Sequence, residues 1–323
     1  MTKQKILISR RWPEAIEAKL QEDYDVTLNQ SDTPLTVEEF QSALANYDAV
    51  CPTVTDKITA ELLDVPSPRC KILGNYGVGF SHIDLDAAKK AGITVTNTPE
   101  VLSDCTADLA MALILMVARR ASEGEREVRA SDWTGWRPTH MVGTKVTGKT
   151  LGIIGFGRIG QKMARKCHFG FDMKIVAQDA YPVKPEALAE TNATLVDTIE
   201  EVLQQADFVS LHCPGGDENY HLINADRLKL MKQNGFLINT ARGEVYDADA
   251  LVDALQSGTI MGAGLDVYEG EPNINPRLKE CENAVLLPHL GSATLETREA
   301  MGNRVLDNLA DFFGGREPRD KVA

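Results

Sequence analysis

Several features that would place this chain in a specialised class are missing. Its 323 residues include 34 basic and 47 acidic side chains, and the net charge of −13 argues against non-specific binding to nucleic acid or anionic lipid. The longest apolar run, residues 109–118, is about half the length that a membrane span needs. The six cysteines form no CxxC pair and no zinc spacing, so we expect buried free thiols and no metal site.

The N-terminal region does not have the composition of a signal peptide, because its apolar run, residues 6–8, is too short and is typical of a strand. Scattered free thiols are typical of a reducing compartment. We therefore expect a cytoplasmic protein with no nucleic-acid or membrane partner. A chain of this length with 43% apolar residues is expected to form about two domains.

The sequence does contain a regular alternation of short apolar runs and amphipathic stretches, which is typical of parallel βαβ units. A first series predicts strands at residues 6–8, 26–28, 49–50, 72–73 and 94–95, with helices at 13–22, 36–44 and 85–90. A second series predicts strands at residues 151–154, 174–177, 193–196, 208–211, 235–239, 261–264 and 284–287. Residues 103–129 are expected to form one long helix, and residues 296–313 a final one. The predicted fold class is α/β with doubly wound parallel sheets.

A glycine turn after the first strand of the second series predicts a dinucleotide site. Gly155 permits a tight turn, Gly157 lets the backbone approach a pyrophosphate, and Gly160 lets the next helix pack closely on the strand. Asp179 stands 19 residues after Gly160, close to the spacing expected for the carboxylate that binds the adenosine ribose. An aspartate there repels a 2′-phosphate, so NAD(H) is preferred, while the nearby Lys184 leaves NADP(H) possible.

A weaker glycine pattern, formed by Gly74, Gly77 and Gly79, follows a strand of the first series. It lacks a third glycine at the offset that a dinucleotide site requires. Two interpretations stay open: the segment is an ordinary tight loop, or its backbone N–H groups bind a small anion.

Arg242, Glu271 and His289 each follow a strand of the second series, where the ligands of open α/β sheets bind. A histidine can protonate a carbonyl oxygen near neutral pH, and a carboxylate on its far nitrogen fixes its tautomer. An arginine can hold a substrate carboxylate with two hydrogen bonds. Each residue alone could be a surface ion pair, an exposed loop acid or a structural histidine. Their occurrence at successive strand ends favours the reduction of a 2-oxo acid.

Four motifs resemble those of the D-isomer-specific 2-hydroxyacid dehydrogenases, in the same order and over nearly the whole chain. They are residues 155–160, 239–243, 264–272 and 288–292. The resemblance implies two Rossmann-like domains with an active-site cleft between them, which closes to exclude water. A flavodoxin-like substrate-binding domain would comprise residues 1–102 and 290–323, and an NAD-binding Rossmann domain residues 103–289. The resemblance also implies a homodimer held largely by the cofactor domains.

The resemblance assigns a role to individual positions. Arg242 would bind and polarise the substrate, and Glu271 would support His289 as the acid/base. Further substrate contacts would come from Val78, Gly79 and Ser292. The residues lining the cofactor would be Thr106, Gly155, Gly157, Arg158, Ile159, Gly160, Asp179, Cys213, Pro214, Asn219, Thr240 and Asp266.

Within this family, residues 75–80 and 289–298 are most similar to glyoxylate/hydroxypyruvate reductases, so we expect NADH-dependent reduction of glyoxylate or hydroxypyruvate. Trp133 or Trp136 would then reach the neighbouring subunit's active site, although His140 stands where relatives often have another tryptophan. A D-lactate or other D-2-hydroxyacid dehydrogenase is an alternative. An NAD(H)-sensing, corepressor-like scaffold that binds proteins is an alternative of another class. Formate dehydrogenation is disfavoured, because those relatives pair the histidine with glutamine and this chain has Glu271.

Overall fold

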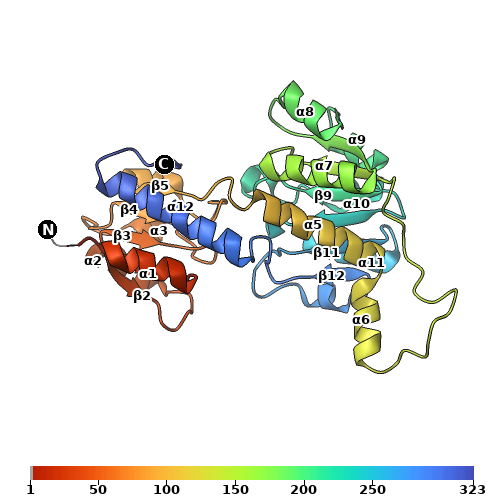
Figure 1. Cartoon of the computed structure of the whole chain (residues 1–323), viewed down its shortest axis with the longest axis horizontal. Coiled ribbons are helices and arrows are strands. Elements are labelled where there is room, and N and C mark those ends of the chain that lie inside the picture. Colours follow the sequence, from red (N-terminus) through yellow and green to blue (C-terminus); the bar gives the residue numbers. More distant parts are fainter. Residues whose placement is uncertain (1–2) are drawn as a thin grey trace. The chain divides into compact units, whose positions relative to one another are not determined.

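The computed structural model describes residues 3–323, which form two compact units (Figure 1). The five-stranded unit contains the described residues up to Leu102 together with Ala293–Ala323, and the seven-stranded unit contains Ser103–Ser292. The chain leaves the seven-stranded unit after Ser292, whereas we expected the boundary directly after His289. The difference arises because Asp266 and Thr106 of the seven-stranded unit hydrogen-bond to the backbone of the intervening residues.

The five-stranded unit is built on a parallel sheet with the order β2-β1-β3-β4-β5. Its strands are β1 (Lys5–Ile8), β2 (Asp25–Leu28), β3 (Ala49–Cys51), β4 (Ile72–Gly74) and β5 (Thr94–Thr96), and its helices are α1 (Glu14–Asp23), α2 (Val37–Asn46), α3 (Ala60–Leu63), α4 (Leu85–Lys90) and α12 (Leu295–Phe313). Apolar side chains of α2, α3 and α4 pack on Leu7, Val50 and Leu73. The helices α1 and α12 lie side by side (Figure 1), and a Cβ at Gly302 would come within 2.5 Å of Ile16. Glycine therefore permits this close helix contact.

The seven-stranded unit has the parallel order β12-β11-β10-β9-β6-β7-β8. Its strands are β6 (Thr150–Ile154), β7 (Lys174–Gln178), β8 (Ala193–Leu195), β9 (Phe208–Leu211), β10 (Phe236–Asn239), β11 (Gly262–Leu265) and β12 (Ala284–Leu286). The strand order reverses between β6 and β9, which is where doubly wound sheets bind ligands. All twelve strands of the two sheets were predicted, with bounds that differ by at most one residue at either end.

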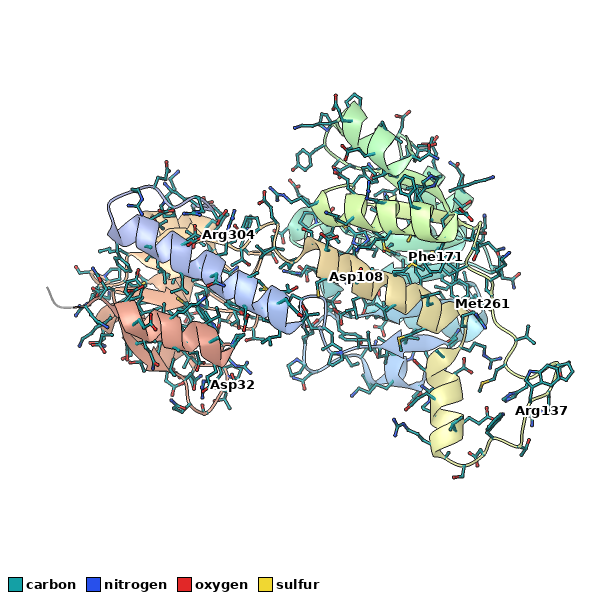
Figure 2. All side chains as sticks on the ribbon, viewed as in Figure 1. Asp32, Asp108, Arg137, Phe171, Met261 and Arg304 are labelled. Atoms are coloured by element: carbon teal, nitrogen blue, oxygen red, sulfur yellow. The ribbon has the colours of Figure 1, made fainter. Side chains whose placement is uncertain are left out.

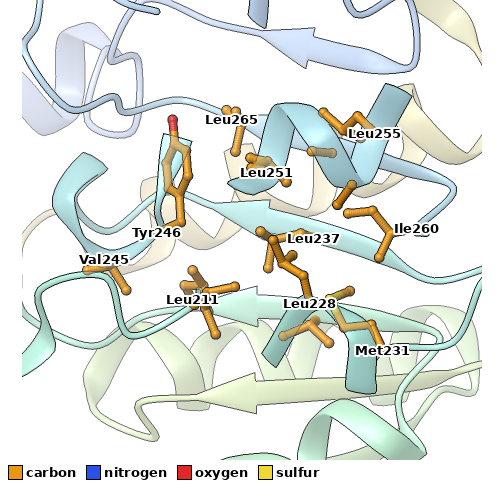
Figure 3. Close-up of a cluster of buried hydrophobic side chains, with 14 of the residues drawn as sticks. Leu211, Leu228, Met231, Leu237, Val245, Tyr246, Leu251, Leu255, Ile260 and Leu265 are labelled. Carbon is orange, nitrogen blue, oxygen red and sulfur yellow. The ribbon is translucent and has the colours of Figure 1, made fainter. Parts of the chain in front are cut away.

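Helices cover both faces of the larger sheet. One face packs against α5 (Ser103–Ala118) and α7 (Arg158–Phe171). The other packs against α9 (Ile199–Gln205), α10 (Ala225–Leu230) and α11 (Ala248–Ser257), and Figure 3 shows this core around Leu237 and the fully buried Tyr246. Short α8 (Pro185–Thr191) follows β7. Burial on both faces explains why the strands are continuous apolar runs.

The prediction of one helix over residues 103–129 is wrong. Arg120 adopts a left-handed backbone conformation (φ 53°) and separates α5 from α6 (Ala121–Arg129). The apolar side chains that α5 buries end at Ala118, and α6 has no buried residue, so packing does not hold the two in one line. After α6 the chain has no regular structure up to β6, and the segment around Arg137 stands clear of the sheet (Figures 1 and 2).

This segment exposes aromatic surface. Trp136 is 82% exposed and Trp133 54%. His140, which sequence reasoning left without a role, is half-buried, and its Nε2 lies 2.9 Å from Oε2 of Glu127 on α6. His140 therefore ties the irregular segment back to α6.

The expectation of free thiols is confirmed for all six cysteines. Five are buried, and Cys105 is partly exposed. Within residues 3–323, none of the helices combines the length and apolar character that crossing a membrane requires.

Candidate active site

His289 and Glu271 form a hydrogen-bonded pair beyond the adjacent parallel strands β12 and β11. Nδ1 of His289 lies 2.9 Å from Oε2 of Glu271, and the backbone N–H of Tyr268 donates to Oε1 at 2.8 Å. Burial acts to raise the pKa of Glu271, but the hydrogen bond and charge of His289, with Tyr268 and Arg242, outweigh burial and lower the pKa. Glu271 is therefore a carboxylate near neutral pH, able to hold a proton on Nδ1 and to stabilise an imidazolium.

Arg242 follows β10 in a turn that Asn239 fixes. The side chain of Asn239 donates to the carbonyl oxygen of Arg242 at 2.8 Å and accepts from the N–H of Ala241 at 2.9 Å. Burial lowers the pKa of Arg242, whereas the charges of Glu244 and Glu271 act to raise it. A guanidinium keeps its charge under such a shift, so a cation stands within electrostatic range of the Glu271 carboxylate.

His289 adopts a left-handed conformation (φ 57°), which is unusual for a residue with a Cβ. The backbone of Asp266 accepts from the N–H of His289 at 2.9 Å, and its carboxylate accepts from the N–H groups of Leu290 (2.6 Å) and Gly291 (2.8 Å). Thr106 donates to the carbonyl oxygen of Gly291 at 3.1 Å. These four bonds hold a strained turn in place, which is common at functional sites. Burial raises the pKa of Asp266, although these N–H groups and the charge of His289 oppose it.

The glycine turn after β6 fits a dinucleotide. Gly155 has φ 90°, and a Cβ there would lie 2.5 Å from the backbone nitrogen of Cys213. A Cβ at Gly160 would lie 2.3 Å from the carbonyl oxygen of Gly155, whereas Gly157 has no atom within 4 Å of that position. No side chain caps the N-terminus of α7 at Gly157. The turn thus leaves open space at the positive end of a helix, as a bound pyrophosphate requires.

Asp179 lies at the end of β7, beside this turn. Its Oδ2 accepts from the N–H of Phe156 at 2.5 Å and its Oδ1 from the N–H of Tyr181 at 2.9 Å. The two bonds fix the carboxylate beside the glycine turn. Lys184 is exposed and begins α8 as its N-cap.

The other predicted cofactor residues follow neighbouring strands of the larger sheet or lie in the first turn of α5 or α7. Thr240, 7% exposed, has a buried hydroxyl with no hydrogen-bond partner among the described residues, which is consistent with a ligand supplying one. Cys213 is buried beside Gly155, and the side chain of Asn219 donates to the carbonyl oxygen of Pro214 at 3.0 Å. Arg158 and Ile159 begin α7, and Thr106 lies in the first turn of α5.

The predicted substrate residues divide between the two units. Ser292 is the last residue of the seven-stranded unit, while Val78 and Gly79 belong to the loop after β4 in the five-stranded unit. No hydrogen-bond partner of the N–H groups of Val78 and Gly79 occurs within the part of the chain that the structure describes. Their carbonyl oxygens accept from Asn97 (2.8 Å) and Asn75 (3.1 Å). These contacts favour the anion-binding interpretation of the loop over the ordinary turn.

Sequence reasoning missed two groups next to the predicted site residues. The N–H of Tyr268 orients Glu271. The charge of Glu244 acts on Arg242, and both side chains lie beside Gly215. Backbone donors have no sequence signal at all. Only the position of Glu244, two residues after Arg242, could have indicated its role.

Comparison with known proteins agrees with this geometry. Residues 111–291 match the family model described as D-isomer specific 2-hydroxyacid dehydrogenase, NAD binding domain. The chain is 45% identical to a glyoxylate reductase of Thermococcus litoralis, over 99% of this chain and 97% of the relative. It is 39% identical to a glycerate dehydrogenase of Hyphomicrobium methylovorum, over 98% of both chains.

Solved structures show the same two-unit fold. A putative D-isomer specific 2-hydroxyacid dehydrogenase of Polaromonas superposes with a TM-score of 0.92 at 36% identity, covering 99% of this chain and all of the other. An NADPH-dependent glyoxylate/hydroxypyruvate reductase of Sinorhizobium meliloti, solved with NADP and malonate, has a TM-score of 0.88 at 31% identity and covers 100% of this chain and 97% of the other.

Proposed function

Because this chain belongs to the D-isomer-specific 2-hydroxyacid dehydrogenase family, and is therefore an oxidoreductase, we propose that it reduces glyoxylate or hydroxypyruvate with NADH. The observation that carries this proposal is the His289–Glu271 pair, with Arg242 in electrostatic range, at the carboxyl edge of a dinucleotide-type sheet. The product is the D-2-hydroxy acid.

The cofactor is held by the turn from Gly155 to Gly160, with its pyrophosphate at the N-terminus of α7. When bound, NADH supplies the hydride for the C2 carbon of the substrate. Asp179 accepts hydrogen bonds from the ribose hydroxyls, and its charge disfavours a 2′-phosphate. NAD(H) is therefore the preferred cofactor, while the exposed Lys184 and the NADP-bound relative leave NADP(H) possible. Cys213, Pro214, Asn219, Thr240 and Asp266, with Thr106, Arg158 and Ile159, line the rest of the site.

His289 supplies the proton for the substrate carbonyl oxygen from its Nε2. Its Nδ1 proton stays on the hydrogen bond to Glu271, so the ring changes between imidazolium and one neutral tautomer. Asp266 keeps the His289 ring in place by accepting from the backbone N–H groups of the two residues after His289. In the oxidative direction the same nitrogen takes the proton back.

Substrate binding is divided among three groups. Arg242 binds the carboxylate and polarises the carbonyl with its guanidinium. The N–H groups of Val78 and Gly79 bind the carboxylate as a backbone nest, and Ser292 contributes a hydroxyl. A small 2-oxo acid is favoured by the relatives, which are named for glyoxylate and glycerate. D-lactate dehydrogenation uses the same groups and differs only in the side-chain pocket.

The protein acts as a homodimer in the cytoplasm. The exposed Trp136, Trp133 and Val128 lie on α6 and the segment after it, and such a surface is typical of a protein contact. Light scattering that gives the mass of one chain at micromolar concentration contradicts the dimer.

The enzymatic test is oxidation of NADH by the purified protein, followed at 340 nm with and without glyoxylate or hydroxypyruvate. A separate assay with D-lactate and NAD follows the formation of NADH and tests the alternative substrate. We expect NADH loss that depends on the added oxo acid, faster than with NADPH. His289→Ala should lower kcat at least 100-fold and leave the Kd for NADH within about twofold. Absence of turnover with every 2-oxo acid in the panel refutes the proposal.

A further inference from the structure

The loop after β4 is held by an unusual set of side-chain hydrogen bonds to three successive carbonyl oxygens. Asn75, fully buried, donates from Nδ2 to the carbonyl oxygens of Gly77 at 3.0 Å and Gly79 at 3.1 Å. Asn97, 7% exposed, donates to the carbonyl oxygen of Val78 at 2.8 Å. The N–H of Thr98 donates to Gly77 as well, at 3.1 Å.

The planarity of the trans peptide relates these carbonyl contacts to the direction of the N–H groups in the loop. In a trans peptide unit the N–H of one residue points opposite to the C=O of the residue before it. Since the carbonyls of Gly77 and Gly79 face Asn75, the N–H groups of Val78 and Phe80 point away from Asn75. The carbonyl of Val78 faces Asn97, so the N–H of Gly79 points away from Asn97. None of these three N–H groups donates to another described residue. Successive N–H groups without a partner among the described residues are the donors from which a backbone nest for a carboxylate is built.

The orientation of the Asn75 amide decides which way the loop faces. Oδ1 of Asn75 lies 3.1 Å from Nε2 of His82. An amide oxygen can only accept, so Nε2 of His82 donates, and the amide NH2 is left for the two carbonyl oxygens. A reversed amide would place its oxygen against the oxygens of Gly77 and Gly79. The two carbonyl oxygens thus select the orientation of the amide, and Nε2 of His82 completes it by donating to Oδ1.

We propose that Asn75, Asn97 and His82 are positioning residues for the substrate carboxylate, and that Phe80 supplies a third N–H donor. This inference rests on the proposed function, in which Val78 and Gly79 bind that carboxylate. The three side chains touch loop carbonyls or one another, and they act through the loop rather than on the substrate.

The isosteric change Asn75→Asp tests this inference, because it keeps the shape and replaces the NH2 by a carboxylate oxygen facing two carbonyl oxygens. The substrate carboxylate is present in both the bound substrate and the transition state, so the lost binding energy appears in KM. We expect KM for glyoxylate or hydroxypyruvate to rise roughly 10- to 100-fold, kcat to change less than about threefold, and the Kd for NADH to stay constant. Asn97→Ala releases one carbonyl and should raise KM less, roughly 3- to 10-fold.

A methyl ester of the 2-oxo acid separates positioning from a general loss of structure, since the ester lacks the anion. The ratio of kcat/KM for acid over ester should fall in Asn75→Asp, and a purely structural defect would lower both values equally. Asn29→Asp is the matched control: Asn29 also donates to two carbonyl oxygens, of Ser9 and Thr33, without touching residues 77–80. This control should keep the wild-type ratio.

The outcomes are distinguishable. If the wild-type protein reduces no 2-oxo acid, the proposed function fails. If the wild type is active but folded Asn75→Asp and Asn97→Ala both keep the wild-type ratio of acid to ester, the positioning role is overturned. His82→Gln, which retains a donor, should keep more of the ratio than His82→Leu, and equal ratios in these two variants contradict the role of His82.

Discussion

Replacing Glu271 by glutamine should inactivate the enzyme more severely than the small change in shape suggests. Oε1 of Glu271 accepts from the N–H of Tyr268 at 2.8 Å, and Oε2 faces Nδ1 of His289 at 2.9 Å. In Glu271→Gln the N–H of Tyr268 selects the amide oxygen, so the NH2 group turns toward His289. The NH2 donates to Nδ1 and stabilises the neutral ring with its proton on Nε2. That ring cannot give up its proton without becoming an imidazolate.

The magnitude follows from the alternative arrangement. If glutamine instead turns its oxygen toward His289, the N–H of Tyr268 faces an NH2 group and loses its acceptor, at about 1–3 kcal/mol. The hydrogen bond to the imidazolium also changes from an ion pair to a bond with a neutral oxygen and becomes weaker by about 1 kcal/mol. The sum, about 2–4 kcal/mol, corresponds to a loss of kcat of roughly 30- to 1000-fold. Glu271→Ala imposes no tautomer and should retain more activity than Glu271→Gln.

The assay is steady-state NADH oxidation with saturating oxo acid at pH 7, together with NADH binding followed by fluorescence. We expect kcat to fall while the Kd for NADH changes less than about twofold, because Glu271 lies outside the glycine turn. A Glu271→Gln enzyme with more than a tenth of the wild-type kcat would refute the tautomer argument. A parallel loss of NADH affinity would show that the substitution disturbs the fold around the site instead.

Two further changes test the cofactor turn and the acid stability. Gly157→Ser adds a favourable N-cap side chain where no atom lies within 4 Å. This variant should keep the wild-type Tm but bind NADH at least tenfold more weakly, as measured by calorimetry. In Gly160→Ala the new Cβ lies 2.3 Å from a carbonyl oxygen, so the free energy of unfolding should fall by about 1–3 kcal/mol. Wild-type NADH affinity in Gly157→Ser contradicts the cofactor's position. Burial acts to raise the pKa of Glu17, but the hydrogen bond and charge of Arg11 and the N–H of Trp12 lower it overall. The ionised Glu17 therefore stabilises the folded protein above its unfolded-state pKa of about 4.3, and this contribution to the free energy of unfolding disappears as the pH falls through the folded-state pKa. Urea unfolding followed by fluorescence of the buried Trp12 should show a difference between wild type and Glu17→Gln that shrinks from pH 7 to pH 3, and a constant difference contradicts it.

Sequence periodicity predicted the strands well because parallel strands buried on both faces are continuous apolar runs. It failed at Arg120, where the helical pattern continues through the break. That pattern includes charged residues at helical spacing in α6, and these neither require nor oppose a continuous helix. Whether α5 and α6 share one axis depends on what α6 packs against, and this is a tertiary property.

The sequence by itself determined that a guanidinium, a carboxylate and an imidazole each follow a parallel strand, namely β10, β11 and β12. Parallel strands bring their carboxyl ends to one edge, so this placement needs no knowledge of side-chain conformation. Only the tertiary structure decided which oxygen of Glu271 faces His289, that Asp266 holds the turn after it, and that Asn75 directs the loop after β4. These are hydrogen bonds between side chains and backbone groups, and the backbone N–H and C=O are the same at every residue. Their direction depends on the path of the loops, which no spacing of residue types encodes.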